Sequence, residues 1–255
     1  MNNTRIKTPR AAFGKLLLNE IRLAWRIPIS LGTGLGLPFA LLIVFGSIPA
    51  LRQVNSALGG FSYFALSFPI LIAMTVLTLS VMVMPRSLIK YRETGILRRL
   101  SVTPVPPSWL LAAQIVINLA IVVAGFIILT VAGVTAFGLE LPKNFPAFLL
   151  ADLLTVASLF AVGLCIAAIV KSDAVAQGIG GFLFFALMFF GGTWIPRPLM
   201  PAILLNISNW IPLGASVDVI QSAMQGTPLS LQSLLVLIVY TVIFGYLALR
   251  YFRWE

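Results

Sequence analysis

Residues 62–107 read SYFALSFPILIAMTVLTLSVMVM-PRSLIKYRETGILRRLSVTPVPP, an uncharged apolar run followed by a loop rich in basic residues and proline. The apolar run is long enough to cross a bilayer as a helix, which takes about 20 residues. In the loop, Glu93 is the only acidic residue among four arginines and one lysine. Basic residues directly after a span are typical of the cytoplasmic side of a membrane. This stretch therefore predicts a membrane-spanning helix with a cytoplasmic loop.

The composition of the whole chain agrees with a membrane protein. Hydrophobic residues make up 60% of the 255 residues and charged residues only 9%, whereas soluble domains carry about 25%. Histidine is absent, and Cys165 is the only cysteine. The chain therefore lacks imidazole for general-base or zinc chemistry and cannot form an internal disulfide. We expect no catalytic, cofactor or metal site, and hence no enzyme activity of the chain by itself.

Six segments are apolar and long enough to span a bilayer. They cover residues 28–48, 62–84, 109–137, 146–170, 174–195 and 229–249. The sequence therefore predicts an all-α polytopic membrane protein in which residues 1–255 form a single transmembrane domain.

The distribution of Lys and Arg predicts the orientation of these spans. Of the 17 basic residues, only Arg52, Lys143 and Arg197 fall on the side opposite the termini. Under the positive-inside rule, both termini are then cytoplasmic. The net charge of +10 is explained by topology and anionic lipid headgroups, so no nucleic-acid partner is expected.

Residues 10–27 carry helical periodicity but too many charges to span. A basic stripe and an apolar stripe lie along this segment, and Glu20 interrupts the apolar one. The pattern predicts an amphipathic helix in the cytoplasmic interface. The alternative is a cytoplasmic extension of the first span, but Pro28 favours a break between them.

Residues 196–226, on the outer side, begin with an unusually apolar stretch. Several prolines between Pro196 and Pro212 exclude one long helix. Two short helices that dip into the outer leaflet would explain an apolar segment that does not span. Trp194 and Trp210 would then lie at the interface.

The cytoplasmic loop contains a short helical pattern over residues 91–100. Ile96, Leu97 and Leu100 share one face, and Pro104 follows soon after. A short helix with an apolar face and charged edges can dock on a partner. A basic loop without a partner explains the pattern equally well.

Two motifs resemble those of one transporter family. Residues 91–104, YRETGILRRLSVTP, are similar to the pattern E-x-G-x-L-[KR]-[RK]-L-x-x-T-P. Residues 192–196, GTWIP, together with Pro201 and WIPL at 210–213, are similar to a second signature region. The chain thus resembles the permease subunit of an ABC-2 type exporter, a bacterial family that exports drugs and antibiotics or lipids and polysaccharides.

The resemblance implies a type V ABC exporter fold. The 10–27 helix would be the connecting helix, 91–100 the cytoplasmic coupling helix, and 196–226 the extracellular re-entrant hairpin that gates the pathway. The ATPase contacts would be Arg92, Glu93, Gly95, Ile96, Leu97, Arg98, Arg99 and Leu100, with Glu93 near the helix start. The outer gate would include Trp194, Pro196, Pro201, Trp210 and Pro212.

The resemblance also implies the partners. Two copies of a cytoplasmic ABC ATPase would bind a homodimer of this permease in the bacterial plasma (inner) membrane. The chain contains no G-x-x-x-x-G-K-[ST] phosphate-binding loop, so ATP and Mg would be held by the ATPase subunit.

Span 174–195 is dense in aromatic residues, which suit a pathway for a hydrophobic or amphipathic substrate. The candidates are Phe182, Phe185, Met188 and Phe189, although packing against lipid or another helix explains them as well. The expected cargo is a drug, an antibiotic or a lipid. Lipid-linked polysaccharide is the alternative, and a secondary transporter or channel is the less favoured one. Asp152 is interpreted as solvated or paired with Lys143.

Overall fold

The computed structural model describes Gly14, residues 28–95 and residues 108–252. The predicted connecting helix at 10–27 and residues 96–100 of the predicted coupling helix lie outside the described residues, apart from Gly14.

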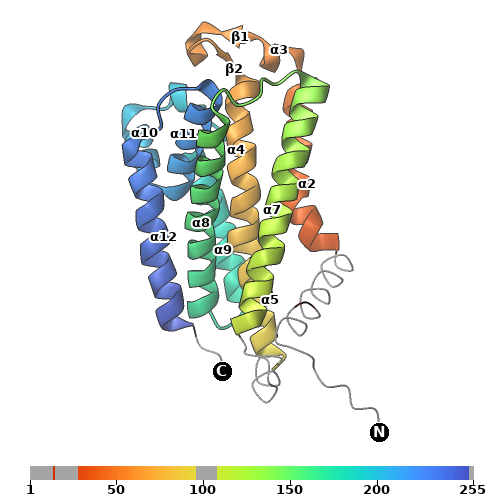
Figure 1. The fold of residues 1–255 in the computed structure, drawn as a ribbon, viewed down its shortest axis with the longest axis vertical. Helices are drawn as coiled ribbons and strands as arrows, with labels where there is room; N and C mark the ends of the chain where they lie inside the picture. Colours follow the sequence, from red (N-terminus) through yellow and green to blue (C-terminus); the bar gives the residue numbers. More distant parts are fainter. Residues whose placement is uncertain (1–13, 15–27, 96–107, 253–255) are drawn as a thin grey trace.

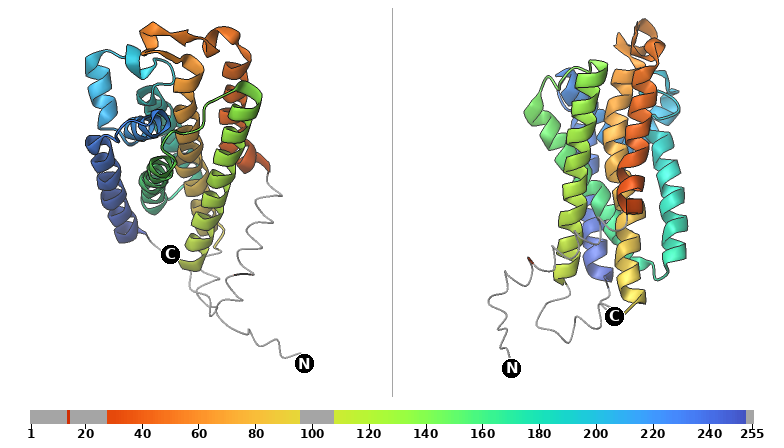
Figure 2. Two further views of the ribbon diagram at one scale, coloured as in Figure 1. Left: turned by 45° about the horizontal axis from the view of Figure 1, so that its top comes forward. Right: turned by 90° about the vertical axis from the view of Figure 1, so that its right-hand side faces the viewer.

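The fold is a bundle of long helices that run side by side (Figures 1 and 2). Five of them are long and apolar enough to cross a membrane: α4–α5, α7, α8, α9 and α12. The sixth, α2, has 20 residues, and its stretch Gly34–Ser47 is apolar. The expected all-α polytopic fold is confirmed. The bounds are Pro28–Ser47 (α2), Tyr63–Thr78 (α4), Met84–Glu93 (α5), Ser108–Phe137 (α7), Phe145–Ile169 (α8), Asp173–Gly191 (α9) and Leu231–Tyr251 (α12).

The two ends of the bundle differ. The upper end in Figure 1 carries the short α3 (Pro49–Arg52) and a β-hairpin of β1 (Val54–Asn55) and β2 (Phe61–Ser62), joined by a 3₁₀ turn at Ser56–Leu58. The strands pair antiparallel, with Val54 opposite Ser62. The lower end carries the ends of α5 and α12 and the short connection between α8 and α9.

The second span differs from the prediction. Instead of ending at residue 84, it passes through the π-helical turn η2 (Leu79–Val83) into α5 and ends at Glu93. Pro85 does not break the helix because it lies in the first turn after the π-helix, where a missing N–H is tolerated. Residues 91–93 therefore end this long helix, and the prediction that a helix starts at residue 91 is wrong.

The upper part of the chain between α9 and α12 is folded into short elements. Helix α9 ends at Gly191 because Gly192 adopts a φ of 96°, the left-handed conformation that glycine favours. A 3₁₀ turn (Arg197–Leu199), α10 (Ala202–Asn209) and α11 (Pro212–Gln225) follow, and α10 and α11 are bent by 93°. This is the expected pair of short helices within residues 196–226.

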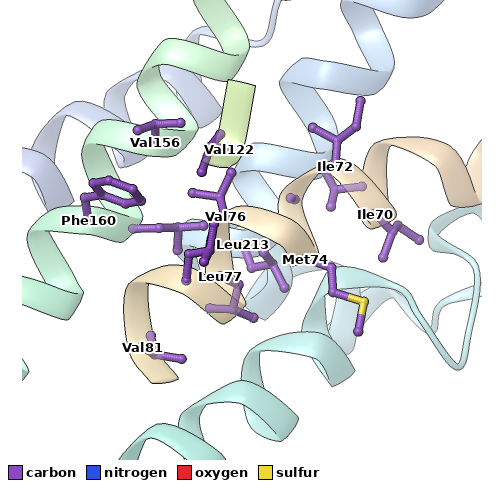
Figure 3. Close-up of a cluster of buried hydrophobic side chains, with 14 of the residues drawn as sticks. Ile70, Ile72, Met74, Val76, Leu77, Val81, Val122, Val156, Phe160 and Leu213 are labelled. Atoms are coloured by element: carbon purple, nitrogen blue, oxygen red, sulfur yellow. The ribbon is translucent and has the colours of Figure 1, made fainter. Parts of the chain in front are cut away.

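The core is centred on the long second span. In the most apolar 18-residue stretch of Tyr63–Glu93, 89% of the residues are buried. In the corresponding stretch of α12, 22% are buried. Helix α4 contacts α2, α7, α8, α9 and α11. Figure 3 shows Ile72, Val76 and Leu77 of α4 among Val122 of α7, Val156 of α8 and Leu213 of α11.

Two glycines allow the π-helical turn to pack closely against its neighbours. A Cβ atom on Gly163 of α8 would lie 2.0 Å from the Ser80 carbonyl oxygen, and one on Gly180 of α9 would lie 2.4 Å from the Val81 oxygen. The Ser80 carbonyl has no ordinary helical partner, since the Met84 amide donates to Leu79 and Pro85 has no N–H. The two glycines thus pack directly against the backbone carbonyl oxygens of the π-helical turn.

Candidate coupling end and outer gate

Arg92 joins α5 to the lower end of α8. Its guanidinium donates hydrogen bonds to the carbonyl oxygens of Val170, at 3.3 Å, and Ala167. It also lies 4.8 Å from the ring centre of Phe252, which follows α12. The last carbonyls of a helix lack partners and carry partial negative charge. Arg92 therefore satisfies the end of α8 and contacts the end of α12.

Glu93, the next residue, joins α5 to the start of α9. Its Oε1 accepts a hydrogen bond from the Asp173 amide at 3.1 Å. Ser172 occupies the N-cap position of α9 but makes no side-chain cap bond, so Glu93 supplies the cap from another helix. Asp173 in turn forms an ion pair with Arg86 of α5 at 3.4 Å. A carboxylate at a helix N-terminus is favoured by the helix dipole.

These contacts change how the predicted coupling residues are understood. Arg92 and Glu93 lie together at the lower end, but both bind within the chain, and Glu93 ends a helix instead of starting one. Gly95 follows with a φ of 68°, which allows the chain to leave α5. Ile96, Leu97, Arg98, Arg99 and Leu100 lie outside the described residues. The ATPase contact itself stays a prediction.

Three of the phenylalanines of α9 form an exposed face. Phe182 and Phe185 are 73% and 63% exposed, and Phe189, one turn further along, is also exposed. Met188 does not belong to this face, because it is only 1% exposed and packs in the core beside Thr193. Met188 lies one turn after Phe184, which is also buried, so these two residues share the helix face that packs on the bundle. Of the four predicted pathway residues, Phe182, Phe185 and Phe189 are thus exposed and Met188 is buried, and the pathway itself stays a prediction.

A polar network built on Arg197 joins the elements of residues 196–226, the predicted outer gate region. The Arg197 guanidinium donates to Ser208 Oγ at 2.8 Å, to the Gly214 carbonyl at 3.0 Å and to Asn209 Oδ1 at 2.7 Å. It also forms an ion pair with Asp218 at 3.3 Å, although the Arg197 side chain is only 9% exposed. Burial lowers the pKa of Arg197, and the charge and hydrogen bond of Asp218 oppose that shift.

The network reaches two spans. Ser208 donates to the carbonyl of Phe190 in α9 at 2.6 Å, and Ser233 of α12 donates to Asp218 Oδ2 at 2.7 Å. Sequence reasoning left Arg197 and Asp218 without a role. The signal that could have found them is one basic and one acidic residue in an otherwise apolar outer segment, where single charges are costly unless paired.

The predicted gate residues lie around this network. Pro196 and Pro201 precede the 3₁₀ turn and α10, and Pro212 begins α11. Proline is favoured at such starts because its missing N–H is not needed there. Trp194 and Trp210 are exposed at the upper end, where tryptophan can lie among lipid headgroups.

Asp152 is not solvated or paired with Lys143. In α8 it is 5% exposed, and its Oδ1 has no hydrogen-bond partner within the described part of the chain. One turn further, the Thr155 hydroxyl also lacks a partner there. Lys143 precedes the helix, and its Cβ lies instead beside Gly226. The interpretation of Asp152 as solvated or paired with Lys143 is therefore wrong. No group of three or more acidic or cysteine side chains in the described ranges could hold a metal.

The bent pair α10–α11 lies at one end of the bundle, and the joined ends of α5, α8 and α9 lie at the other. Both lie in the part of the chain that matches a known family. The sequence profile described as "ABC-2 type transporter" matches residues 11–225, which includes α2 to α11 and both motifs. The chain belongs to the ABC-2 type transporter family. No curated protein matches it.

Membership in the ABC-2 family establishes the general role of the chain. It is the membrane permease component of an ABC transporter and is not itself the catalytic subunit. The family implies association with a cytoplasmic ABC ATPase and a multi-pass location in a membrane.

Proposed function

We propose that this ABC-2 permease works as a homodimer with two copies of a separate ATPase and exports a hydrophobic or amphipathic compound. The compound would be a drug, an antibiotic or a lipid, moved out through the bacterial inner membrane, with both termini of the chain in the cytoplasm. The observation that supports an apolar cargo is the exposed face of Phe182, Phe185 and Phe189 on α9. Aromatic rings offer large contact areas to apolar molecules without demanding fixed hydrogen bonds.

The lower end would transmit the ATPase motion. Residues 96–100 would contact the ATPase, with Arg98 and Arg99 as charged contacts, and they follow directly on α5. Because Arg92 and Glu93 bind the ends of α8 and α9, a displacement of α5 would be passed to both helices. ATP and Mg would be held by the ATPase.

Two alternative functions differ from this proposal, one in its cargo and the other in its energy source. A lipid-linked polysaccharide exporter would use the same fold with another cargo. A secondary transporter would use an ionisable group inside the membrane, and Asp152 is the buried carboxylate available for it. Family membership favours the ATP-driven mechanism.

Co-purification and transport test the proposal together. The tagged chain is isolated in mild detergent with the proteins that bind it, and inside-out membrane vesicles are incubated with Hoechst 33342 or with a fluorescent phospholipid in the medium. We expect an ABC ATPase to co-purify and ATP to drive probe uptake even when a protonophore is present. If no ATPase is recovered and the protonophore abolishes transport, the exporter proposal is wrong.

The cargo class is tested on α9. Replacing Phe182, Phe185 and Phe189 by alanine should change probe preference while expression is retained. The matched control replaces three exposed residues of α12, Leu235, Val242 and Leu249, and should leave preference unchanged. If both triple variants alter transport alike, or if the α9 variant lowers only expression, the phenylalanines do not contact cargo.

A further inference from the structure

A cavity of about 390 Å³ lies at the upper end, apart from the gate network. It is open to one side and lined by the end of α3, by α4, by the connection between α7 and α8, by one face of α11 and by the β-hairpin. The backbone fixes two of these walls to each other, because the amides of Lys143 and Asn144 donate to the Met224 and Ala223 carbonyls at 3.2 Å. The cavity is thus built from elements held by main-chain hydrogen bonds.

The lining of the cavity is amphipathic. Its apolar part is formed by Phe64, Leu66 and Pro69 of α4 with Leu139 and Met224. Pro69 lies five residues after Phe64, so the apolar part extends roughly 7.5 Å along α4. Its polar part includes Gln221 and Gln225, one turn apart on α11, whose amides can donate hydrogen bonds.

The charges on the rim favour an anion. Arg52 and Lys143 line the cavity together with Glu140, which leaves an excess of one positive charge. Within the described ranges, neither Arg52 nor Lys143 forms an ion pair, and only Arg197 does so among the basic residues at this end. Arg197 is therefore committed to the gate, whereas the charges of Arg52 and Lys143 remain available to a ligand.

We propose that this cavity binds an anionic amphiphile, with its charged headgroup at Arg52 and Lys143 and its apolar part against Phe64, Leu66 and Leu139. Phosphate or carboxylate headgroups fit the two cations, which can form charge-assisted hydrogen bonds. A membrane phospholipid and a cargo molecule share this chemistry. The proposal goes beyond the exporter function, because it assigns a ligand site on this chain whether or not the ATPase is bound.

The site lies next to the outer gate. Leu66 and Gln221 line both the cavity and a much smaller space that reaches Gly192 and Arg197. A ligand in the cavity would therefore contact residues that also face the Arg197 network. This position would suit a molecule that leaves the pathway at the upper end or a lipid that stabilises the gate region.

Native mass spectrometry of the purified full chain tests the proposal without ATP or transport. The detergent-solubilised chain is titrated with dioleoylphosphatidylglycerol and, separately, with dioleoylphosphatidylcholine, which has the same acyl chains but no net charge. We expect tighter binding of the phosphatidylglycerol. The double variant Arg52→Ala/Lys143→Ala should weaken it by at least about tenfold, as expected for the loss of charge-assisted contacts.

Matched control variants distinguish loss of the proposed binding site from a general effect of substitution on lipid binding. The control Lys171→Ala/Arg250→Ala removes two exposed cations at the lower end and should bind phosphatidylglycerol as the unchanged chain does. Ala65→Phe places a ring in the apolar part of the cavity and should also weaken binding. Ala136→Phe, exposed on α7 and outside the cavity lining, should not. Size-exclusion profiles check that each variant is folded.

Two further experiments identify whether the ligand is a resident membrane lipid or a cargo molecule. Phosphatidylglycerol that co-purifies from membranes and is depleted in the Arg52/Lys143 variant indicates a resident lipid. Uptake of added dodecyl phosphate by a chain that carries no phospholipid indicates a cargo-like amphiphile. Both results support the site. Equal binding of the two phospholipids, normal binding by the double or Ala65→Phe variant, or displacement by the same concentration of inorganic phosphate would overturn it. Co-purification of the ATPase is independent of all these outcomes.

Discussion

Arg197 at the upper end and Arg92 at the lower end both make hydrogen bonds within the protein, but to different kinds of group. Arg197 meets side chains and a carboxylate within one compact region, and its charge is balanced by Asp218. Arg92 meets main-chain carbonyls at the end of α8 and an aromatic ring beyond α12. Its chain neighbour Glu93 binds a different helix, α9.

The difference shows what each end is suited to do. At the upper end, donors and acceptors satisfy one another around an ion pair whose arginine is buried, so movement of one member leaves the others unpaired at a cost. At the lower end, two adjacent residues of α5 bind the ends of two separate helices. Those contacts can move as a unit with α5. Under the proposed function, the upper contacts would hold residues 196–226 in one arrangement, and the lower contacts would pass on a displacement of α5.

The largest effect is expected from removing Arg197. Arg197→Ala leaves Asp218 and the Gly214 carbonyl without their buried partner, which should lower the free energy of unfolding by about 4 kcal/mol. Titration with sodium dodecyl sulfate in mixed micelles measures this quantity. Arg52→Ala, at the same end but exposed, is the control and should change stability by less than about 0.5 kcal/mol. Similar losses for both variants would show that the network does not hold the gate.

The second-largest loss of stability is expected where α8 packs against the π-helical turn, in the part of the bundle between the two ends. Gly163→Ala places a methyl group within 2.0 Å of the Ser80 carbonyl oxygen. Since a backbone oxygen cannot be moved aside cheaply, we expect a loss of about 3 kcal/mol by the same titration. Gly181→Ala, whose Cβ would meet no atom within 4 Å, is the control. An unchanged Gly163→Ala variant would mean that the turn and α8 can separate freely.

Removing Arg92 should cost less than removing Arg197. Arg92→Ala takes two hydrogen bonds from carbonyls that water can partly replace at the lower end, so we expect a loss of about 2 kcal/mol. Probe-stimulated ATP hydrolysis by the reconstituted complex should fall more steeply than stability if α5 transmits motion. Lys90→Ala, at an exposed position two residues earlier, provides the comparison. Normal stimulation in Arg92→Ala would contradict a transmitting role.

The smallest effect is expected for Glu93. Glu93→Ala removes the cap of α9, worth about 1 kcal/mol for a typical N-cap. Hydrogen exchange should rise at the amides of the first turn of α9, from Asp173 onward, while α12 remains protected. Lys171→Ala serves as a control in the same connection. Exchange that is unchanged in Glu93→Ala would show that the cap does not fix the helix start.

The sequence was informative wherever one residue type decides local structure. Apolar runs revealed the spans, and Pro196, Pro201 and Pro212 predicted the short outer elements because proline restricts its own backbone. The continuation past Pro85 was missed, since a π-helical turn depends on the packing of Gly163 and Gly180 against it. The partners of Arg92, Glu93 and Arg197 could not be predicted either. These contacts join residues far apart in the chain, and no local pattern specifies them.

Asp152 illustrates the same limit. Its distance from the predicted start of the span suggested an interfacial carboxylate, yet its helix face is covered by the bundle. Position along a span sets depth in the membrane, whereas burial depends on which neighbours surround the helix.

The length of the second span has a consequence for how the protein meets bilayers of different thickness. Tyr63–Glu93 contains 31 residues, and a helix of that length measures about 46 Å, whereas the hydrocarbon layer is about 30 Å thick. A continuous helix that begins at the upper face must therefore leave the hydrocarbon layer well before Glu93. Its last turns extend into the headgroups and the water beyond. Thinning or thickening of the bilayer would change how much of α5 stands clear of the lipid, and would leave its hydrogen bonds to α8 and α9 intact.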